Sequence, residues 1–504
     1  MSSDPEIADR APNGSAGAGS GDVVMRIVRN TSVLAITNLV VRGLGMVLMV
    51  LLARYLGAQG YGTYQRAEAF VLLFSMLANL GLDVILTREV ARGDRRVPEH
   101  LAGVVVLKLV LGLVTCGLVL GIAYARGYGG DFLYSIWMYA IVLFLGGIAQ
   151  AEEAVFQGRE KMGRVAVASL ANQCTVLVLG LAGIAMHKDL RWFLTNLVVA
   201  TAVRLAVSTA LLVRSGVDWQ RPKLATLRYL LTESLPIAFA ASFVIVYQQV
   251  DAVMLGEMKG NTEVGWYKAS AKFLLFFIVL RESFLQAVFP VFSSIASLTR
   301  ERLGHLVTRV VRYQVVIALY FVLCFVFLAR LAPRLLGPEF ENSAHVLPVM
   351  AWILVPQIIS ITTGRALIAS GDQARIMVGT GLSLIVNVGL NLLLIPRFSY
   401  LGAAVSGVTS EVVVAAVNLY FFNRLVAPTA LTRALAKPVL AAALAGVGLY
   451  AARALPLYVA FPLAAVLYGG ALLALRAFSA EEWRQVRSVA TRAKSRLING
   501  RTAG

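Results

Sequence analysis

The stretch Leu56-Gly57-Ala58-Gln59-Gly60-Tyr61-Gly62-Thr63-Tyr64-Gln65-Arg66-Ala67-Glu68-Ala69-Phe70 joins two long apolar segments and returns in altered form about two hundred residues later. The second copy contains Val264-Gly265-Trp266-Tyr267-Lys268-Ala269-Ser270-Ala271-Lys272-Phe273. At one constant offset, Gly62, Tyr64, Ala67 and Phe70 stand opposite Gly265, Tyr267, Ser270 and Phe273. Both copies place charged residues at the start of an apolar segment. A repeat of this kind predicts a membrane transporter built from two similar halves.

Composition independently indicates a membrane protein. The chain has 504 residues, of which 58% are hydrophobic and 14% charged, with a mean hydropathy of +0.75. Soluble domains carry about 25% charged residues. The net charge of +19 is spread over short loops rather than gathered on one face, which argues against a nucleic-acid partner. Cys116, Cys174 and Cys324 lie singly in apolar segments without metal-ligand spacing, so no metal site is expected.

The apolar runs predict an all-α polytopic membrane protein. Fourteen runs are each close to the roughly 20 residues that a helix needs to cross a bilayer. The expected spans are 31–53, 66–87, 101–124, 132–156, 165–186, 191–213, 229–254, 265–290, 307–329, 344–369, 375–395, 401–423, 436–453 and 456–476. Lys and Arg favour alternate loops by about three to one, which predicts that both termini are cytoplasmic.

The same reading divides the chain into five parts. Residues 1–25 lack an apolar signal-peptide core and are expected to form a disordered cytoplasmic tail. We expect an N-lobe of six spans at 26–225, a C-lobe of six at 226–425, and two appended helices at 426–477. Because six spans separate the two repeat copies, the lobes should run parallel. Residues 478–504 carry Trp483, Val486 and Leu497 at helical spacing among basic residues, which predicts an amphipathic helix on anionic lipid.

Several short motifs, in their order along the chain, carry a family resemblance. They are the Leu56–Tyr64 turn, Gly81-Leu82 followed by Thr87-Arg88-Glu89, Leu235-Pro236 with Asp251, the Val264–Tyr267 turn, Phe289-Pro290, and Asn387–Pro396 followed by Leu401-Gly402-Ala403-Ala404. Over about residues 26–425 the chain resembles the oligosaccharide flippase (polysaccharide transporter) family of the multidrug, oligosaccharidyl-lipid and polysaccharide exporter superfamily. The resemblance implies V-shaped lobes around a central cavity. It also implies alternating-access export of lipid-linked oligosaccharide to the outer leaflet of the cell (cytoplasmic or inner) membrane, for O-antigen, exopolysaccharide or capsule synthesis.

A polyprenyl-diphosphate-linked oligosaccharide would need a hydrated, cationic path. Moving its charge through hydrocarbon unaided would cost on the order of tens of kcal/mol. The candidates that could lower this barrier are the basic residues inside expected spans, each of which costs a few kcal/mol unless it faces water or a partner. They are Arg42, Arg66, Lys108, Arg204, Lys268, Lys272, Arg281 and Arg365.

Helical spacing narrows that set to headgroup-binding candidates. In the second expected span Gln65, Glu68, Leu72, Ser75, Asn79 and Asp83 form one polar stripe, and in the first span Asn38 lies one turn from Arg42. Arg42 and Lys272 are the strongest cation candidates, with Arg281 less favoured because it points away from Lys272. The predicted substrate-binding set is Arg42, Lys272, Arg281, Arg66, Glu68, Asn38, Asn79 and Asp83. Buried ion pairs, such as Arg66 with Glu68 or Arg42 with Asp83, are the alternative interpretation.

A second polar stripe predicts a coupling-ion site in the C-lobe. Asn387 and Asn391 continue a helical row from Thr380 and Ser383, and Asp251 lies in the seventh span. Their oxygens could bind Na⁺, or Asp251 could take a proton. Plain interhelical hydrogen bonds are the alternative. No other cofactor is expected. Besides the lipid-linked substrate and membrane lipids, polysaccharide polymerase machinery is a candidate partner, and we expect a monomer.

Other functions stay open from sequence. A cation-coupled multidrug antiporter would share the fold, and Glu68 with Asp83 would suit its acidic site. A lipid II flippase differs only in substrate. A glycan-polymerising enzyme is disfavoured because the longest expected outer loop, 330–343, has no obvious acid and base pair. The repeat copies differ in charge, with Glu68 opposite Ala271 and Ala69 opposite Lys272, and substrate choice is expected to depend on that asymmetry.

Overall fold

The computed structural model describes residues 20–93, 96–217, 219–296, 299–327, 329–452 and 457–478, and within these ranges it holds helices and no strand. Short connections join the helices. In order they are α1 (Ser20–Leu73), α2 (Ser75–Asn79), α3 (Leu82–Ala91), α4 (Val97–Ala125), α5 (Gly130–Gly158), α6 (Met162–Ala185), α7 (Leu190–Val213), α8 (Leu224–Met258), α9 (Asn261–Phe273), α10 (Leu275–Ala296), α11 (Arg300–Phe327), α12 (Leu331–Leu336), η1 (Pro338–Phe340), α13 (Ser343–Ala351), α14 (Leu354–Ala369), α15 (Ala374–Leu425), α16 (Leu431–Ala451) and α17 (Leu457–Ala474).

The all-α multi-pass architecture is confirmed. Eight helices in the described residues are long and apolar enough to cross a membrane, or up to ten if each bent pair is one span. Two helices are each too long for one crossing, because 52 or more residues at about 1.5 Å per residue far exceed about 30 Å of hydrocarbon. α1 turns at Gly57 (φ 67°) and α15 at Ser399 (φ 50°). The count of fourteen spans stays a prediction.

The second expected span is not a continuous helix, and that detail of the prediction is wrong. The helix stops after Asn79, and Leu80 (φ 45°) and Gly81 (φ 73°) adopt left-handed backbone before α3 begins. Gly81 suits this turn because glycine adopts positive φ without steric cost. The polar stripe expected along 65–83 is therefore broken before Asp83.

The predictions for the two ends of the chain can be compared with the structure only where it describes residues. α1 already begins at Ser20, within the range expected to form a disordered tail. Residues 1–19 and the predicted amphipathic helix beyond Phe478 lie outside the described residues.

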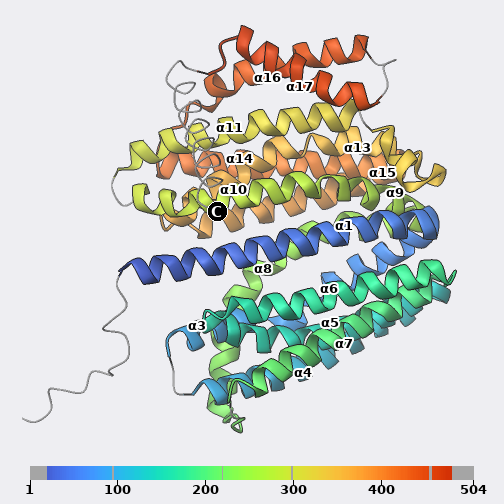
Figure 1. The fold of residues 1–504 in the computed structure, drawn as a ribbon, viewed down its shortest axis with the longest axis vertical. Helices are drawn as coiled ribbons and strands as arrows, with labels where there is room; N and C mark the ends of the chain where they lie inside the picture. Colours follow the sequence, from blue (N-terminus) through green and yellow to red (C-terminus); the bar gives the residue numbers. More distant parts are fainter. Residues whose placement is uncertain are drawn as a thin grey trace, which may run out of the picture.

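The helices pack in two groups, visible below and above α1 in Figure 1. α3–α7 lie in one group and α9–α15 in the other, while α1 contacts α5, α6 and α9. α8 links the groups, since it packs against α3 and α4 as well as against α15. α16 and α17 pack against α11 at the edge of the second group.

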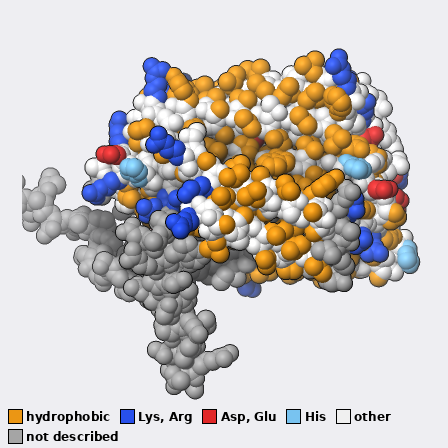
Figure 2. Space-filling view, turned by 90° about the horizontal axis from the view of Figure 1, so that it is seen from above, with side chains coloured by type: hydrophobic (Ala, Val, Ile, Leu, Met, Phe, Trp, Pro, Cys, Tyr) orange, Lys and Arg blue, Asp and Glu red, His pale blue; other side chains and the backbone are white. Residues whose placement is uncertain are grey.

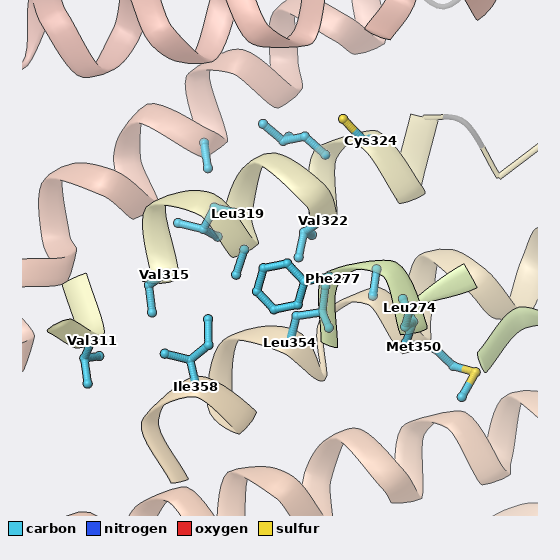
Figure 3. Close-up of a cluster of buried hydrophobic side chains, with 14 of the residues drawn as sticks. Leu274, Phe277, Val311, Val315, Leu319, Val322, Cys324, Met350, Leu354 and Ile358 are labelled. Carbon is cyan, nitrogen blue, oxygen red and sulfur yellow. The ribbon is translucent and has the colours of Figure 1, made fainter. Parts of the chain in front are cut away.

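The core of the second group is apolar. Phe277 lies among Leu319, Val322, Leu354 and other buried aliphatic side chains from α10, α11 and α14 (Figure 3). The face shown in Figure 2 is also apolar: hydrophobic side chains cover its middle, whereas Lys and Arg gather at its two ends. That distribution suits helices that cross a hydrocarbon layer lengthwise, with charges at the two interfaces.

Candidate functional site

The two copies of the sequence repeat meet at one end of the bundle, which we call the turn end because it holds the Gly57 and Gly260 turns. A Cβ on Gly62 would overlap the carbonyl oxygen of Asn261, and a Cβ on Gly265 would overlap that of Ala58. Only glycine permits so close an approach of two backbones. The repeat therefore forms the contact between the two halves.

An ion-pair cluster, the turn-end network, surrounds this contact. Arg66 Nη2 lies 2.8 Å from Glu257 Oε1, and Arg66 Nη1 donates to Asn261 Oδ1 at 2.9 Å. Glu257 also pairs with Arg126 Nη2 at 2.9 Å and accepts a hydrogen bond from Tyr128. Hydrogen bonding to Glu257 raises the pKa of the Arg126 guanidinium, so Arg126 stays charged. The network ties the N-terminal half, through Arg66 and Arg126, to α8 and α9.

The suggested ion pair between Arg66 and Glu68 is therefore wrong, because Arg66 reaches Glu257 instead. Glu68 accepts a hydrogen bond from Gln65 Nε2 at 2.9 Å, and it lies close enough to attract Lys268 electrostatically from the other half. Residues 66 and 68 are two apart on a helix, so their side chains point in different directions.

The loop between α12 and α13 also closes the turn end. Glu339 Oε2 accepts from the backbone N–H of Ala58 at 2.9 Å, and its carbonyl oxygen accepts from Trp266 Nε1 at 2.7 Å. Phe340 packs edge-on against Tyr61, and both are fully buried. This segment, which suggested no chemistry in the sequence, contacts both repeat copies.

Buried charges in the N-terminal half are paired with one another. Lys108 Nζ, whose side chain is 1% exposed, pairs with Asp83 and donates to the carbonyl of Gly147 at 2.9 Å. Arg204 forms a two-pronged pair with Glu153, at 2.7 and 2.6 Å. The suggested pair between Arg42 and Asp83 is wrong, since Asp83 pairs with Lys108.

The two strongest cation candidates stand apart from these pairs. Arg42 is exposed on α1, and Lys272 is partly buried near the end of α9. Among the described residues, neither side chain makes a hydrogen bond or ion pair. Asn38 lies on α1, but its side chain is outside the described set, and Asn79 Oδ1 is buried without a hydrogen-bond partner.

Two arginines of the C-terminal half share one carboxylate. Arg281 Nη2 lies 2.8 Å from Glu282 Oε1, and Arg365 Nη2 lies 3.1 Å from Glu282 Oε2. Arg281 also donates from Nη1 to Gln357 Oε1 at 2.5 Å. Two guanidinium groups with one carboxylate leave one positive charge in excess.

The residues predicted to bind a coupling ion do come together. Asp251 Oδ1 accepts from Asn391 Nδ2 at 2.7 Å, and Asp251 Oδ2 accepts from Tyr267 OH at 2.9 Å. Asn391 Nδ2 also donates to Asn387 Oδ1 at 3.0 Å. The described residues include no cluster of three or more His, Cys, Asp or Glu side chains suited to a metal ion. An ion here would rely on one carboxylate with amide and hydroxyl oxygens.

A second carboxylate in this half escaped the sequence analysis. Glu411 on α15 is 5% exposed and accepts from Tyr247 OH at 3.0 Å and from Ser360 Oγ at 2.5 Å. Glu257 and Glu153 were also missed as partners. The criterion that selects Arg and Lys inside apolar runs, if extended to acidic residues, identifies Glu153 and Glu411.

A bundle of long apolar helices, in which the two copies of the repeat meet at one end, is the fold of a multi-pass membrane transporter. The chain belongs to the polysaccharide biosynthesis protein family, whose model matches residues 27–296, more than half of the sequence. The MatE family model also matches residues 236–393. The chain is thus a flippase-type member of the multidrug, oligosaccharidyl-lipid and polysaccharide exporter superfamily, which confirms the family prediction.

Two curated relatives cover most of the chain. A "probable low-salt glycan biosynthesis flippase Agl15" of Haloferax volcanii is 22% identical over 406 residues, spanning 80% of this chain and 84% of that protein. A "putative O-antigen transporter" of Escherichia coli K12 is 23% identical over 387 residues, spanning 73% of this chain and 90% of that protein. Both names describe transporters rather than enzymes.

Solved structures share the fold. The lipid II flippase MurJ in an inward closed conformation has a TM-score of 0.72 at 12% identity, covering 88% of this chain and 98% of its own. An inward-facing multidrug resistance MATE family transporter has a TM-score of 0.64 at 14% identity, covering 78% and 98%. At such low identity these likenesses establish the fold alone.

Proposed function

We propose that this flippase moves polyprenyl-diphosphate-linked oligosaccharide from the cytoplasmic to the outer leaflet for surface polysaccharide synthesis. The observation that carries the proposal is an excess of cations within the helical bundle. Arg42 and Lys272 make no ion pair among the described residues, and Arg281 with Arg365 share the single carboxylate of Glu282. Cations that lack a carboxylate partner on a membrane-spanning bundle favour an anionic headgroup, because the headgroup would supply the missing counter-charge.

The proposal includes alternating access between two arrangements of the lobes. The glycine contact and the turn-end network close one end of the bundle in this structure. If that end faces outward, as the loop charges predict, the substrate enters from the cytoplasmic side and leaves when the network opens. Both termini would then be cytoplasmic, with the protein in the cell membrane. A monomer and a functional link to polysaccharide polymerase belong to the same proposal.

Ion coupling at Asp251 is a further part of the proposal. Asp251 is buried, and its partners are neutral: Asn391 and Tyr267. A buried carboxylate without a cationic partner gains stability by taking up Na⁺ or a proton. Loss of that ion would change the packing of α8 against α9 and α15, which all contribute to the site.

Reconstitution tests the transport step. Purified protein in liposomes is given a fluorescent or isotopically labelled polyprenyl-diphosphate oligosaccharide, and the fraction accessible at the opposite leaflet is measured over time. We expect Arg42→Ala and Lys272→Ala each to slow flipping at least about tenfold, equivalent to about 1.4 kcal/mol. Lys161→Ala and Arg330→Ala remove exposed charges at helix ends and should not change the rate. Unchanged flipping in both Arg42→Ala and Lys272→Ala would contradict the assignment of the cations.

The same vesicles test the other substrates that the fold allows. A cation-coupled multidrug antiporter is one alternative, because the MatE model and MATE structures match this chain. A lipid II flippase is another, because the structure of MurJ has the same fold. Efflux of cationic dyes without flipping of any lipid-linked glycan would favour the antiporter. Flipping of lipid II in preference to lipid-linked oligosaccharide would favour the lipid II flippase.

A further inference from the structure

Glu411 is a buried carboxylate that none of the steps above uses. It lies in the second half of α15, between Ser410 and Val412, and its residue is 5% exposed. Among the described residues Glu411 makes no ion pair. Its two bonded partners, Tyr247 and Ser360, are hydroxyl groups from α8 and α14. A carboxylate held in an apolar bundle by neutral hydroxyls alone is costly while charged and much cheaper when protonated.

The Ser360 hydroxyl can satisfy either protonation state of Glu411. Ser360 Oγ lies 2.5 Å from Glu411 Oε1 and 3.1 Å from the carbonyl oxygen of Gln357. When Glu411 is ionised, Ser360 donates to the carboxylate. When Glu411 is protonated, the acid donates to Ser360 Oγ, and Ser360 donates to the Gln357 carbonyl. A proton can therefore be gained or lost without leaving either group unpaired.

The same contacts lead to the arginine cluster, which consists of Arg281 and Arg365 with their shared partner Glu282. Gln357 accepts from Arg281 through its side-chain Oε1, at 2.5 Å, while its backbone carbonyl faces Ser360. Glu411, Ser360, Gln357 and Arg281 thus form one continuous chain of contacts. A change at Glu411 reaches the guanidinium that we assign to the substrate headgroup.

On its other side Glu411 adjoins the Asp251 site. Tyr247 lies one helical turn before Asp251 on α8 and donates to Glu411 Oε2. A Cβ on Gly407, one turn before Glu411, would lie 3.4 Å from Asp251 Oδ2, so this turn of α15 adjoins the Asp251 carboxylate. In that site Asn391 Oδ1 is buried and has no hydrogen-bond partner. Asp251 and Glu411 are therefore neighbouring buried carboxylates in the C-terminal half.

Charged and titratable groups face this pair from each packed helix. They are Tyr247 and Asp251 on α8, Tyr267 and Lys268 on α9, and Arg281 on α10, which attracts Glu411 without forming an ion pair. On α14, Arg365 is occupied by Glu282, and the one titratable residue of α13, His345, is exposed.

We propose that Glu411 is a proton-binding site that couples proton movement to the arginine cluster. Hydronium reaching the C-terminal half from one side transfers a proton to the Glu411 carboxylate, which yields the neutral acid and water, and the reverse reaction on the other side returns it. While ionised, Glu411 draws the positive charge of Arg281 toward itself. Once protonated it no longer attracts Arg281, so the charge of Arg281 is more available to the anionic headgroup. This inference deepens the proposed function and depends on it for its purpose, although protonation itself requires no transported lipid.

Infrared difference spectroscopy of full-length protein in liposomes tests the site directly, with protons as the probe. Raising the pH from mildly acidic to mildly alkaline should remove a carbonyl stretching band of a protonated carboxylic acid in wild type. Glu411→Gln should abolish that band, and Tyr247→Phe should keep it at a shifted frequency because one hydrogen bond is lost. Glu339→Gln, which removes a carboxylate from the α12–α13 loop, should leave the band unchanged.

Several outcomes would overturn the proposal. They are a full band in Glu411→Gln, a band that disappears in Asp251→Asn instead, and a band that Na⁺ removes at constant pH while pH does not. If Glu411→Gln does not fold, Ser360→Ala and Tyr247→Phe test the assignment instead. Each removes a hydrogen bond to Glu411 and must shift the band, so an unshifted band in both would overturn the proposal. A normal band in a protein that flips no lipid-linked glycan would support the proton site and contradict the proposed function separately.

Discussion

The two halves of the bundle hold buried charge differently. In the N-terminal half Lys108 pairs with Asp83 and Arg204 with Glu153, so each charge is neutralised by its partner. In the C-terminal half Asp251 and Glu411 are bonded to amides and hydroxyls instead. Two buried carboxylates of the N-terminal half also have neutral bonded groups: Glu152 is bonded to Thr209, and Glu99 to Thr226 and to the backbone N–H of Lys223.

The difference separates charges that serve folding from charges that serve transport. A buried ion pair stabilises only the arrangement in which its two groups are in contact, because separating them leaves two buried charges uncompensated. A carboxylate with neutral partners can exchange a proton or a cation at modest cost. We infer that the buried carboxylates of the C-terminal half carry the changing charge, while the buried ion pairs of the N-terminal half keep their helices in place.

The largest expected effect comes from breaking a pair in the N-terminal half. Asp83→Ala leaves the Lys108 ammonium without an ionic partner at 1% exposure, which should cost about 3–5 kcal/mol of unfolding free energy. Thermal unfolding of detergent-purified protein measures it. The double variant Asp83→Ala, Lys108→Met should recover most of the loss. If the double variant is as unstable as the single one, the pair is not what stabilises this half.

The next effect concerns the contact between the halves. Gly62→Val places a side chain against the Asn261 carbonyl, and overpacking of this kind costs about 1–3 kcal/mol. The strain should open the turn end. In a background without native cysteines, Ala58→Cys should then react faster with an impermeant thiol reagent. Gly43→Val is the control, since a Cβ there meets nothing within 4 Å. Equal labelling in all three proteins would show that the glycine contact does not close this end.

A smaller effect is expected from the turn-end network. Glu257→Gln keeps the side-chain shape but removes the charge shared by Arg66 and Arg126, which are 12% and 61% exposed. Such partly exposed pairs contribute about 1 kcal/mol and are screened by salt. Labelling of Ala58→Cys should therefore increase with salt in the parent protein and lose that dependence in Glu257→Gln. Glu263→Gln, also at the turn end, should behave like the parent; a salt-independent parent would contradict the role of the network.

The smallest effect should come from the C-terminal arginine cluster. Arg365 is 30% exposed and shares Glu282 with Arg281, so Arg365→Gln leaves Glu282 still paired. We expect less than about 1 kcal/mol of stability change in the same thermal assay. A loss as large as that of Asp83→Ala would remove the contrast between the halves.

Much of this organisation could be predicted from the sequence. Composition gave the membrane class, and the order of short motifs gave the family. Helical spacing placed Asn387 and Asn391 on one face, and the structure brings Asp251 of α8 to that face, as the predicted ion site requires. Whether Arg42 and Lys272 bind substrate stays a prediction, as does the number of spans.

Other features could not be predicted because they depend on which helices become neighbours. Spacing places Asp83 on a face of its helix but does not say that Lys108 lies opposite. The break at Leu80 and Gly81 interrupts a polar stripe that looked continuous in the sequence. Glu411 differs from these features, because its position inside an apolar run is visible in the sequence, although an anion-binding path requires cations rather than carboxylates.

One comparison of transport rates tests the contrast between the halves most directly. Flipping of labelled polyprenyl-diphosphate oligosaccharide is measured for two double variants, each normalised to folded protein. Glu153→Gln with Arg204→Gln neutralises a pair in the N-terminal half and should keep most of the wild-type rate. Asp251→Asn with Glu411→Gln should lower the rate at least about tenfold without loss of thermal stability. The reverse order of rates would contradict the assignment of transport charge to the C-terminal half.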